Sequence, residues 1–183
     1  MENSLKAVFV IAATLAVAQA GSLSGRRIPS FSLPDSQAVY HDILDYRGKV
    51  LLVEVMQTNC PHCQELSAQL EKVNEKYGEK LPILAIVVPP DSVQTVAPFI
   101  TRFHIRYPVL FDCGQATAAM LKVTPTNPQV HFPHLLLVDK RGMIVDDFDS
   151  EHDDAVLTGP GLMERIDKFV ADAAAMGAAK KAK

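Results

Sequence analysis

A Cys-Pro-His-Cys motif at residues 60–63 constrains this chain more than any other feature, because of where it falls. The apolar, β-branched run 50–56 before it is typical of a buried strand, and residues 61–77 after it show the apolar spacing of a helix. Pro61 suits the first helical position, where its missing N–H would be unpaired in any case, and Asn59 is the expected N-cap. The motif is therefore expected at a junction from strand to helix.

This placement gives the two cysteines different chemistry. A thiol at a helix N-terminus faces unpaired N–H groups and the positive end of the helix dipole, which favour the thiolate of Cys60. Cys63, one turn further along, can attack a mixed disulfide formed on Cys60. A disulfide between them would close almost no loop and so stabilise little, which argues against a purely structural role. The motif predicts a reversible dithiol/disulfide pair.

Two neighbouring side chains are candidates for a part in this chemistry. Burial of Glu54 on the expected strand would raise the pKa of its carboxyl toward neutrality, a useful value for taking a proton from Cys63. The alternative is that this face of the strand is exposed. An imidazolium at His62 would stabilise Cys60 as a leaving group and make the disulfide more oxidising. The alternative is a solvated histidine.

The composition limits the class of protein. The chain has 183 residues, of which 48% are hydrophobic, and a formal net charge of −3, which suits one globular domain. No basic face is visible, so nucleic acid is not an expected partner. The terminal run 180–183 is read as a short solvated basic tail.

The first twenty residues differ from the rest. The stretch 7–18 is apolar apart from Thr14, and Ala18-Gln19-Ala20 fits a signal-peptidase site. The stretch is shorter than the roughly 20 residues that span a bilayer. We expect residues 1–20 to be a secretory signal cleaved after Ala20, with one domain over 21–183 and its core at about 28–176. The alternative is an uncleaved anchor, and only then would the protein contact a membrane.

The rest of the chain alternates expected strands and helices, which favours a parallel α/β sheet with an antiparallel edge. After a flexible lead at 21–27, the expected elements are an extended segment 29–33, strands 83–88 and 109–111, helices 91–103 and 115–121, a hairpin within 135–148 and a final helix 162–176. Asp91 and Gln94 resemble a capping box for the second helix, and Pro98 predicts a kink or a late start. The proline-rich stretch 124–133 cannot be helical. Cys113 is read as a small buried filler, with a second redox role or an intermolecular role as the alternative.

The chain resembles the thioredoxin superfamily, in the exported redoxin branch of TlpA and ResA type thiol:disulfide oxidoreductases. The resemblance rests on the motif, on Glu54 six residues before it, and on Pro133 six residues before the Asp139 turn. It implies a thioredoxin-like mixed sheet flanked by helices, with an extra strand-helix unit between the motif helix and the strand after Pro133. It also implies a cis Pro133 that, with Phe132, aligns an extended substrate peptide.

The resemblance further implies an exported, periplasmic or otherwise extracytoplasmic enzyme without a diffusible cofactor. Its redox group would be the Cys60–Cys63 disulfide. Its partners would be proteins that bear thiols or disulfides, together with a redox-recycling protein. Two departures from the family pattern bear on the choice of partner protein and on the direction of the redox reaction. Asn59 stands where the family usually has tryptophan, and His134 follows the proline where threonine is usual. The Pro-His dipeptide inside the motif is instead similar to that of DsbA-type oxidases.

Two other functions remain open from the sequence. Cys60, Cys63, His131 and His134 could form a set for zinc or Cu(I), as in an exported metallochaperone or metal sensor on the same fold. A peroxidase is a weaker alternative, because peroxiredoxins place a threonine three residues before their reactive cysteine and this chain has Gln57 there.

Overall fold

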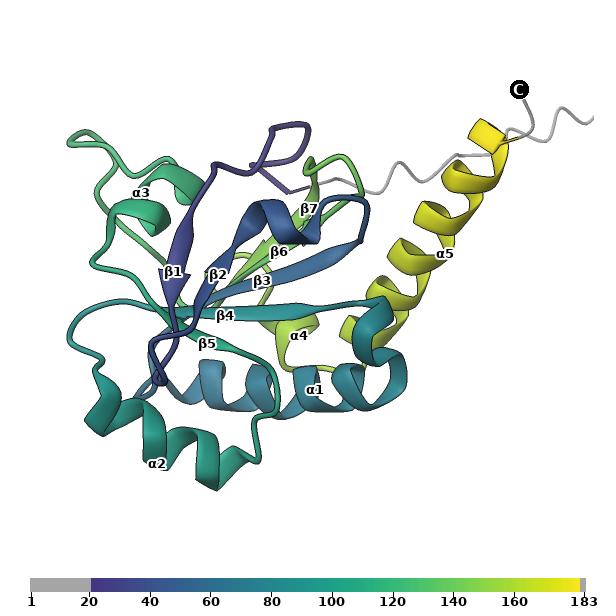
Figure 1. The fold of residues 1–183 in the computed structure, drawn as a ribbon. Helices are drawn as coiled ribbons and strands as arrows, with labels where there is room; N and C mark the ends of the chain where they lie inside the picture. The colour runs from purple at the N-terminus through teal and green to yellow at the C-terminus, as the bar shows by residue number, and fades with distance from the viewer. Residues whose placement is uncertain (1–20, 182–183) are drawn as a thin grey trace, which may run out of the picture.

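A five-stranded mixed sheet forms the centre of the computed structural model, which describes residues 21–181. The expected secretory segment 1–20 lies outside the described residues. The strand order is β5-β4-β3-β6-β7 (Figure 1). The strands are β3 (Leu51–Met56), β4 (Ile83–Val87), β5 (Val109–Phe111), β6 (His134–Val138) and β7 (Ile144–Asp149). Because β3 pairs parallel with β4 and antiparallel with β6, the cysteine motif follows the central strand.

Helices and a small hairpin surround this sheet. The helices are α1 (Pro61–Tyr77), α2 (Val93–Phe103), α3 (Gln115–Leu121), α4 (Asp154–Leu157) and α5 (Gly161–Lys181), with 3-10 turns η1 (Ile43–Tyr46) and η2 (Gly78–Lys80). A separate antiparallel pair joins β1 (Ser32–Pro34) to β2 (Tyr40–Asp42). The expected mixed sheet flanked by helices is confirmed, and two strand-helix units, β4 with α2 and β5 with α3, lie between α1 and β6. No helix among residues 21–181 combines the length and the apolar character needed to cross a bilayer.

Side chains of β3 alternate between two cores. Leu52 and Met56 pack with the inward side of α1 and with residues of α2, α4 and α5. Leu51, Val53 and Val55 pack on the opposite face with the N-terminal segment, η1 and Met120 of α3. Period-2 alternation therefore places Glu54 on the α1 face, because it shares the parity of Leu52 and Met56. The strand is buried on both faces, as an interior strand should be.

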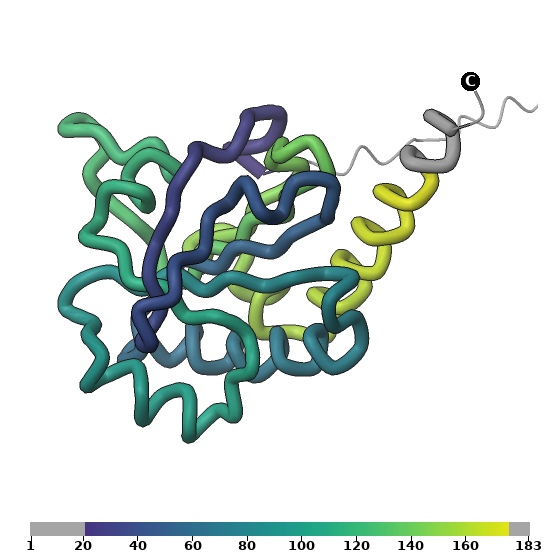
Figure 2. Tube along the Cα trace, in the orientation of Figure 1, coloured from purple at the N-terminus to yellow at the C-terminus, as the bar shows by residue number. Residues whose placement is uncertain are grey.

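The N-terminal lead was expected to be flexible, and that prediction is wrong. Leu23 and Ile28 are buried in the core. The backbone N–H of Gly25 donates to the carbonyl of Ile144, and Arg27 forms a bridge with Met143. Figure 2 shows this lead lying along the turn between β6 and β7. The seven residues are held by backbone hydrogen bonds that a local reading of composition does not reveal.

The second helix also differs from expectation in its start. Ser92 and Thr95, rather than Asp91 and Gln94, form the capping box, and the helix runs from Val93 through Pro98. The short helix α4, which was not expected, lies between β7 and α5. It contacts α1, since Gln69 donates a 3.1 Å hydrogen bond to the carbonyl of Leu157. The hairpin β6-β7, helix α3 and the final helix are confirmed.

Candidate active site

The motif lies at the junction expected for it, at the carboxyl end of the central strand and the start of α1 (Figure 1). Pro61 occupies the first helical turn, as predicted. The predicted N-cap, Asn59, is wrong by one residue, because Cys60 itself holds the cap position with extended φ and ψ of −81° and 120°. Its sulfur takes the place of the oxygen acceptor that a serine or aspartate would supply there.

The two cysteines are free thiols in different surroundings. Cys60 is partly exposed, and its Sγ accepts a 3.3 Å hydrogen bond from the backbone N–H of Cys63. Cys63 is fully buried. Burial, the charge of Glu54 and the contact with Cys60 together raise the pKa of the Cys63 thiol far above its usual range. One thiol therefore faces solvent and a helix N-terminus, while the other is kept protonated in the interior.

Glu54 is buried completely on the α1 face, so the alternative of an exposed strand face is ruled out. Burial raises the pKa of its carboxyl to about 8. Neither carboxylate oxygen has a hydrogen-bond partner among the described residues. The carboxyl lies close enough to Cys63 for its charge to raise the pKa of that thiol. The structure thus brings the buried acid and the buried thiol together under α1.

A tyrosine that the sequence analysis missed belongs to the same interior cluster. Tyr107, just before β5, is buried on the α1 face, and its hydroxyl has no partner among the described residues. Burial, followed by the charge of Glu54, raises the pKa of Tyr107 well above its usual value. Buried, unpaired hydroxyl and carboxyl groups are the usual hosts of internal water. No local motif marks Tyr107; only the register of the sheet brings it to this face.

The loop before the motif is fixed by an aspartate on the neighbouring β4-α2 connection. Asp91 accepts a 2.9 Å hydrogen bond from the backbone N–H of Thr58 and a further short one from the Thr58 hydroxyl. Gln64 donates to the carbonyl of Thr58 at 2.8 Å from the other side. Asp91, expected as part of a helix cap, thus holds the cysteine loop in place.

The segment that precedes β6 lies against the exposed thiol. The Phe132–Pro133 peptide bond is cis, as the resemblance implied, and Pro133 is buried. A second cis bond, Pro89–Pro90, was not expected. The Sγ of Cys60 donates a 3.6 Å hydrogen bond to the carbonyl of Phe132. Phe132 and Pro133 are therefore beside the motif, although they are more than 70 residues away in the sequence.

His62 is exposed on the first turn of α1, and its Nδ1 forms a 2.8 Å ion pair with Asp154 of α4. The histidine is thus exposed to solvent, as in the alternative interpretation, and it also contacts a carboxylate. A salt bridge this exposed contributes little to stability.

The set of four metal ligands suggested by the sequence is not assembled. His131 pairs with Glu151 at 2.9 Å, whereas His134 is buried and pairs with Asp147 at 3.2 Å. Within residues 21–181, the one group of three clustered potential ligands is Asp149, Glu151 and His152, without any cysteine. The two histidines diverge because His134 begins the buried strand β6 while His131 lies in the loop before it.

Cys113 is exposed, so its interpretation as a buried filler is wrong. It follows β5, where Asp112 instead takes the buried position and accepts hydrogen bonds from the backbone of α3. The strand β5 ends at Phe111, two residues before Cys113, and the Cys113 side chain is exposed to solvent.

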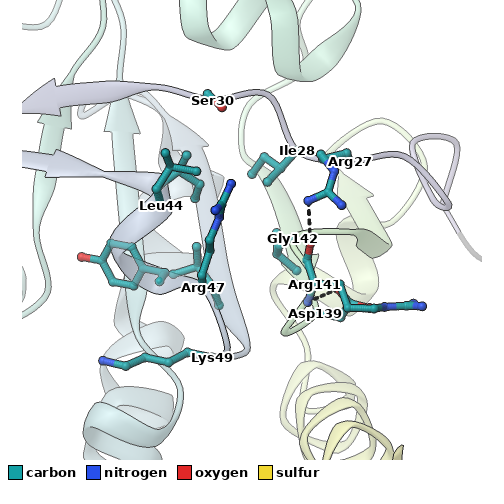
Figure 3. Close-up of a pocket in the computed structure, with 13 residues that line it drawn as sticks. Arg27, Ile28, Ser30, Leu44, Arg47, Lys49, Asp139, Arg141 and Gly142 are labelled. Atoms are coloured by element: carbon teal, nitrogen blue, oxygen red, sulfur yellow. Dashed lines mark hydrogen bonds and ion pairs between the residues drawn. The ribbon is translucent and has the colours of Figure 1, made fainter.

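A hollow at the other end of β3 contains none of the candidate residues (Figure 3). Its walls carry Arg27, Arg47, Lys49 and Arg141, with Asp139 paired to Arg141 at 2.8 Å. It lies beside Leu51, at the start of β3, whereas the cysteines follow its end. Its charges therefore have no direct contact with the thiol site.

Comparison with known proteins agrees with the fold and the motif. A model described as the AhpC/TSA family matches residues 24–146, about two thirds of the chain. The chain belongs to this family. The matched range begins in the N-terminal lead and contains the cysteine motif, Glu54 and Pro133.

The individual relatives share about a quarter of their aligned residues with this chain. The chain is 25% identical over 136 residues to the thiol-disulfide oxidoreductase ResA of Bacillus anthracis, covering 74% of this chain and 75% of that protein. It is 24% identical over 130 residues to the thioredoxin-like protein YneN of Bacillus subtilis, covering 70% and 72%.

Solved structures show the same fold. One is the thioredoxin domain of a thiol-disulfide oxidoreductase from Bacteroides vulgatus, with a TM-score of 0.63, 21% identity, and coverage of 80% of this chain and 97% of that one. Another is a secreted Mycobacterium tuberculosis disulfide oxidoreductase homologous to E. coli DsbE, with a TM-score of 0.58, 16% identity, and coverage of 78% and 95%.

Proposed function

We propose that this chain is a protein thiol-disulfide oxidoreductase that exchanges electrons with cysteines of other proteins through Cys60 and Cys63. The observation that carries the proposal is the asymmetry of the pair at the start of α1: one sulfur is accessible and accepts an N–H, the other is buried. The relatives named ResA support this activity, and so does the shared fold.

The proposed reaction is two successive exchanges. The Cys60 thiolate attacks a substrate disulfide, forms a mixed disulfide and releases one substrate thiolate. Cys63 then loses its proton and attacks the Cys60 sulfur, which releases the second substrate thiolate. The substrate gains two electrons and the chain becomes a disulfide. Run in reverse, the same steps oxidise a substrate dithiol.

Glu54 is the proposed acceptor of the Cys63 proton. Resolution needs a thiolate at Cys63, yet burial and the charge of Glu54 disfavour that thiolate in the free protein. Because its pKa is raised to about 8, the ionised carboxylate of Glu54 is a stronger base than an ordinary carboxylate, and in that form it can take the proton from the thiol and return it in the reverse reaction. The unpaired state of both its oxygens leaves it free to do so.

Phe132 and Pro133 are the proposed substrate-positioning residues. The Phe132 carbonyl already lies 3.6 Å from Cys60 Sγ, on an extended segment that precedes β6. An extended substrate peptide can pair with such a backbone by strand addition, which would bring its disulfide to the thiolate. His62 is proposed to stabilise the Cys60 thiolate electrostatically and so to make the disulfide more oxidising.

The proposed setting is outside the cytoplasm. We infer that residues 1–20 direct export and are removed after Ala20, which would leave the enzyme in the periplasm or an equivalent compartment. A second redox protein would then restore the dithiol or the disulfide after each cycle. Contact with a membrane is expected only if the segment stays attached.

The activity is tested by turnover of a disulfide protein such as insulin with dithiothreitol as the reductant. Wild type should accelerate the reduction, Cys60→Ser should abolish the acceleration, and Cys63→Ser should slow it and accumulate a mixed disulfide. Cys113→Ser is the matched control and should behave as wild type. Peroxide consumption by the same variants separates a peroxidase, so that peroxide turnover without insulin reduction would reject the proposal.

A further inference from the structure

A hollow of about 250 Å³ lies beside Gly21, the first described residue, and none of the three cysteines lines it. Its lining is rich in acidic groups. The titratable and charged residues around it are Asp146, Asp147 and Asp149 of β7, His152 and Asp153 of the following loop, and Arg165 of α5. This hollow takes no part in the thiol chemistry proposed above.

The positive charges around the hollow do not balance its carboxylates. Arg165 is the sole fully cationic side chain that lines it, and its Nη1 is 3.8 Å from Asp146 Oδ2. His152 is committed to Asp149 at 2.9 Å. His134 of β6, which does not line the hollow, pairs with Asp147 Oδ2 at 3.2 Å. Among the described residues, Asp146 accepts backbone N–H groups from Gly21 and Asp147 but has only the long ion pair with Arg165 as a contact with a cation, and burial raises the pKa of its carboxyl.

The backbone nitrogen of Gly21 lies against Asp146, where a positive charge would stabilise the carboxylate. Its nitrogen donates a 2.8 Å hydrogen bond to Asp146 Oδ1. Two residues on, the N–H of Leu23 donates a 2.8 Å hydrogen bond to Asp147 Oδ1. A Cβ added at Gly21 would overlap both the carboxylate and the carbonyl oxygen of Asp147. This position therefore accepts glycine and no other residue without a shift of the backbone.

We propose that the hollow is the binding site of the chain's own α-ammonium group, created when cleavage after Ala20 makes Gly21 the first residue. This rests on the export proposed above. An endopeptidase hydrolyses the Ala20–Gly21 peptide bond with one water, which leaves a carboxylate on Ala20 and an amine on Gly21 that takes up a proton. The same nitrogen that donates as an amide in the uncleaved chain then carries a positive charge against Asp146.

The ion pair predicts a pH dependence with a definite sign. An exposed α-amino group titrates at about 7.7–8.0, and the carboxylate beside it should raise that value in the folded protein. A group whose pKa is raised on folding contributes stability below its unfolded value, and the contribution is lost as the pH rises through the folded value. Cleavage should thus stabilise the protein at pH 6 and 7, but not at pH 10.

The test compares three purified chains that differ at the N-terminus alone, since residues 21–181 contain the whole fold described. One begins at Gly21, one begins at Nα-acetylated Gly21, and one begins at Ala20. Acetylation is the matched control, because it keeps the N–H donor and removes the charge. At pH 6 the free Gly21 chain should melt about 2–4 °C higher than the acetylated chain, and the difference should vanish at pH 10.

Two further measurements test whether Asp146 is the partner of the Gly21 ammonium group. Asp146→Asn should abolish the difference in melting temperature between the free and acetylated chains. In protein labelled with ¹³C-glycine, the Gly21 signal of the free chain should titrate above pH 8.5, about half a unit or more beyond the exposed reference. Equal melting temperatures at pH 6, or a Gly21 titration at the exposed value in a folded chain, would overturn the ion pair.

Failure of the export proposal is distinguished by a separate readout. N-terminal sequencing of the protein recovered from outside the cytoplasm should begin at Gly21. Another first residue would overturn cleavage at this bond and the physiological role argued from it, whatever the purified chains show. Gly21→Ala in the chain that begins at residue 21 should melt lower than wild type, because the added methyl group meets Asp147.

Discussion

The exposed thiol of Cys60 lies 3.6 Å from the carbonyl oxygen of Phe132, across two segments separated by more than 70 residues. This contact joins the sulfur that is proposed to attack the substrate disulfide to the backbone that is proposed to align the substrate. It exists because β3 and β6 are neighbours in the sheet, so that the end of one strand meets the start of the other. Because β3 is the central strand and pairs with β6, the cysteine motif at its end lies beside the segment that leads into β6.

The burial of the cysteines predicts their order of reaction with alkylating agents. Cys60 and Cys113 should react with iodoacetamide in native protein, whereas Cys63 should be protected because it is fully buried and its thiol pKa is raised. Mass mapping after short exposure at pH 6.5 measures the order. Modification of Cys63 ahead of Cys60 would reverse the roles assigned to the pair.

Glu54 should make the protein less stable as the pH rises. Its pKa is raised by burial from 4.5 to about 8, so the folded state binds more protons than the unfolded state between these values. In that window this group lowers the unfolding free energy by about 1.4 kcal/mol per pH unit. Glu54→Gln should flatten the profile obtained from urea unfolding between pH 5 and 8.

The control for this series is Glu65→Gln, on the exposed side of α1, which should leave the profile of the wild type unchanged. Glu54→Gln should also slow the resolving step, measured as decay of the mixed disulfide with a model peptide. A variant that is more stable yet resolves at the rate of wild type at pH 6 and pH 8 would show that the carboxyl moves no proton.

His62 should make the disulfide more oxidising. We propose that the imidazole of His62 favours the reduced, thiolate form of Cys60, and Asp154 contacts that imidazole at 2.8 Å. His62→Ser should lower the potential by on the order of 30 mV, which corresponds to a change of about 1.4 kcal/mol for two electrons. Asp154→Asn should shift it in the same direction by less. His152→Ser, at an exposed histidine outside the site, should not shift it.

The wild-type potential itself is informative, since we expect it to be more oxidising than the roughly −270 mV of thioredoxin. Equilibration with glutathione buffers measures it. A wild type as reducing as thioredoxin, together with an unshifted His62→Ser, would favour a reductant and end the oxidase-leaning interpretation of the Pro-His dipeptide.

Asp147 should be a major determinant of stability. It is 4% exposed, it accepts from the N–H of Leu23 at 2.8 Å, and it pairs with His134 at 3.2 Å. Asp147→Ala leaves both groups without a partner in the interior, which should cost about 2–3 kcal/mol of unfolding free energy. Urea unfolding at pH 7 measures the loss, with the exposed Asp45→Ala as the control. A loss no larger than that of the control would show that the lead is not held through Asp147.

Local pattern was sufficient for the elements that carry the motif. The apolar run before Cys60, the helical spacing after it and the burial of Glu54 on that run are properties of short segments, and each was predicted correctly. Some wrong predictions were local, since the caps of α1 and α2 lie one residue further along than expected. Others concern residues whose surroundings come from distant parts of the chain. The lead from Gly21 is ordered by carboxylates of β7, and His134 is taken by Asp147 rather than by the cysteines.

Tyr107 and Asp91 are two residues near the cysteine site that local sequence pattern did not identify. Nothing near either residue in the sequence indicates a role at the cysteine site. Tyr107 reaches the Glu54 face because β5 pairs with β4, and Asp91 reaches Thr58 because the β4-α2 loop lies beside the end of β3. Sheet register, which a single sequence does not display, decides both positions.

The central claim, that Cys60 and Cys63 form a reversible redox pair, is tested most directly by equilibrating the protein in glutathione buffers of defined ratio. The reaction is quenched with an alkylating agent, and the cysteines are mapped by mass spectrometry. The account predicts a two-electron transition in which a Cys60–Cys63 disulfide replaces the two thiols while Cys113 stays unpaired. Stable glutathionylation of Cys60 without closure of the pair, or a disulfide between Cys60 and Cys113, would contradict it.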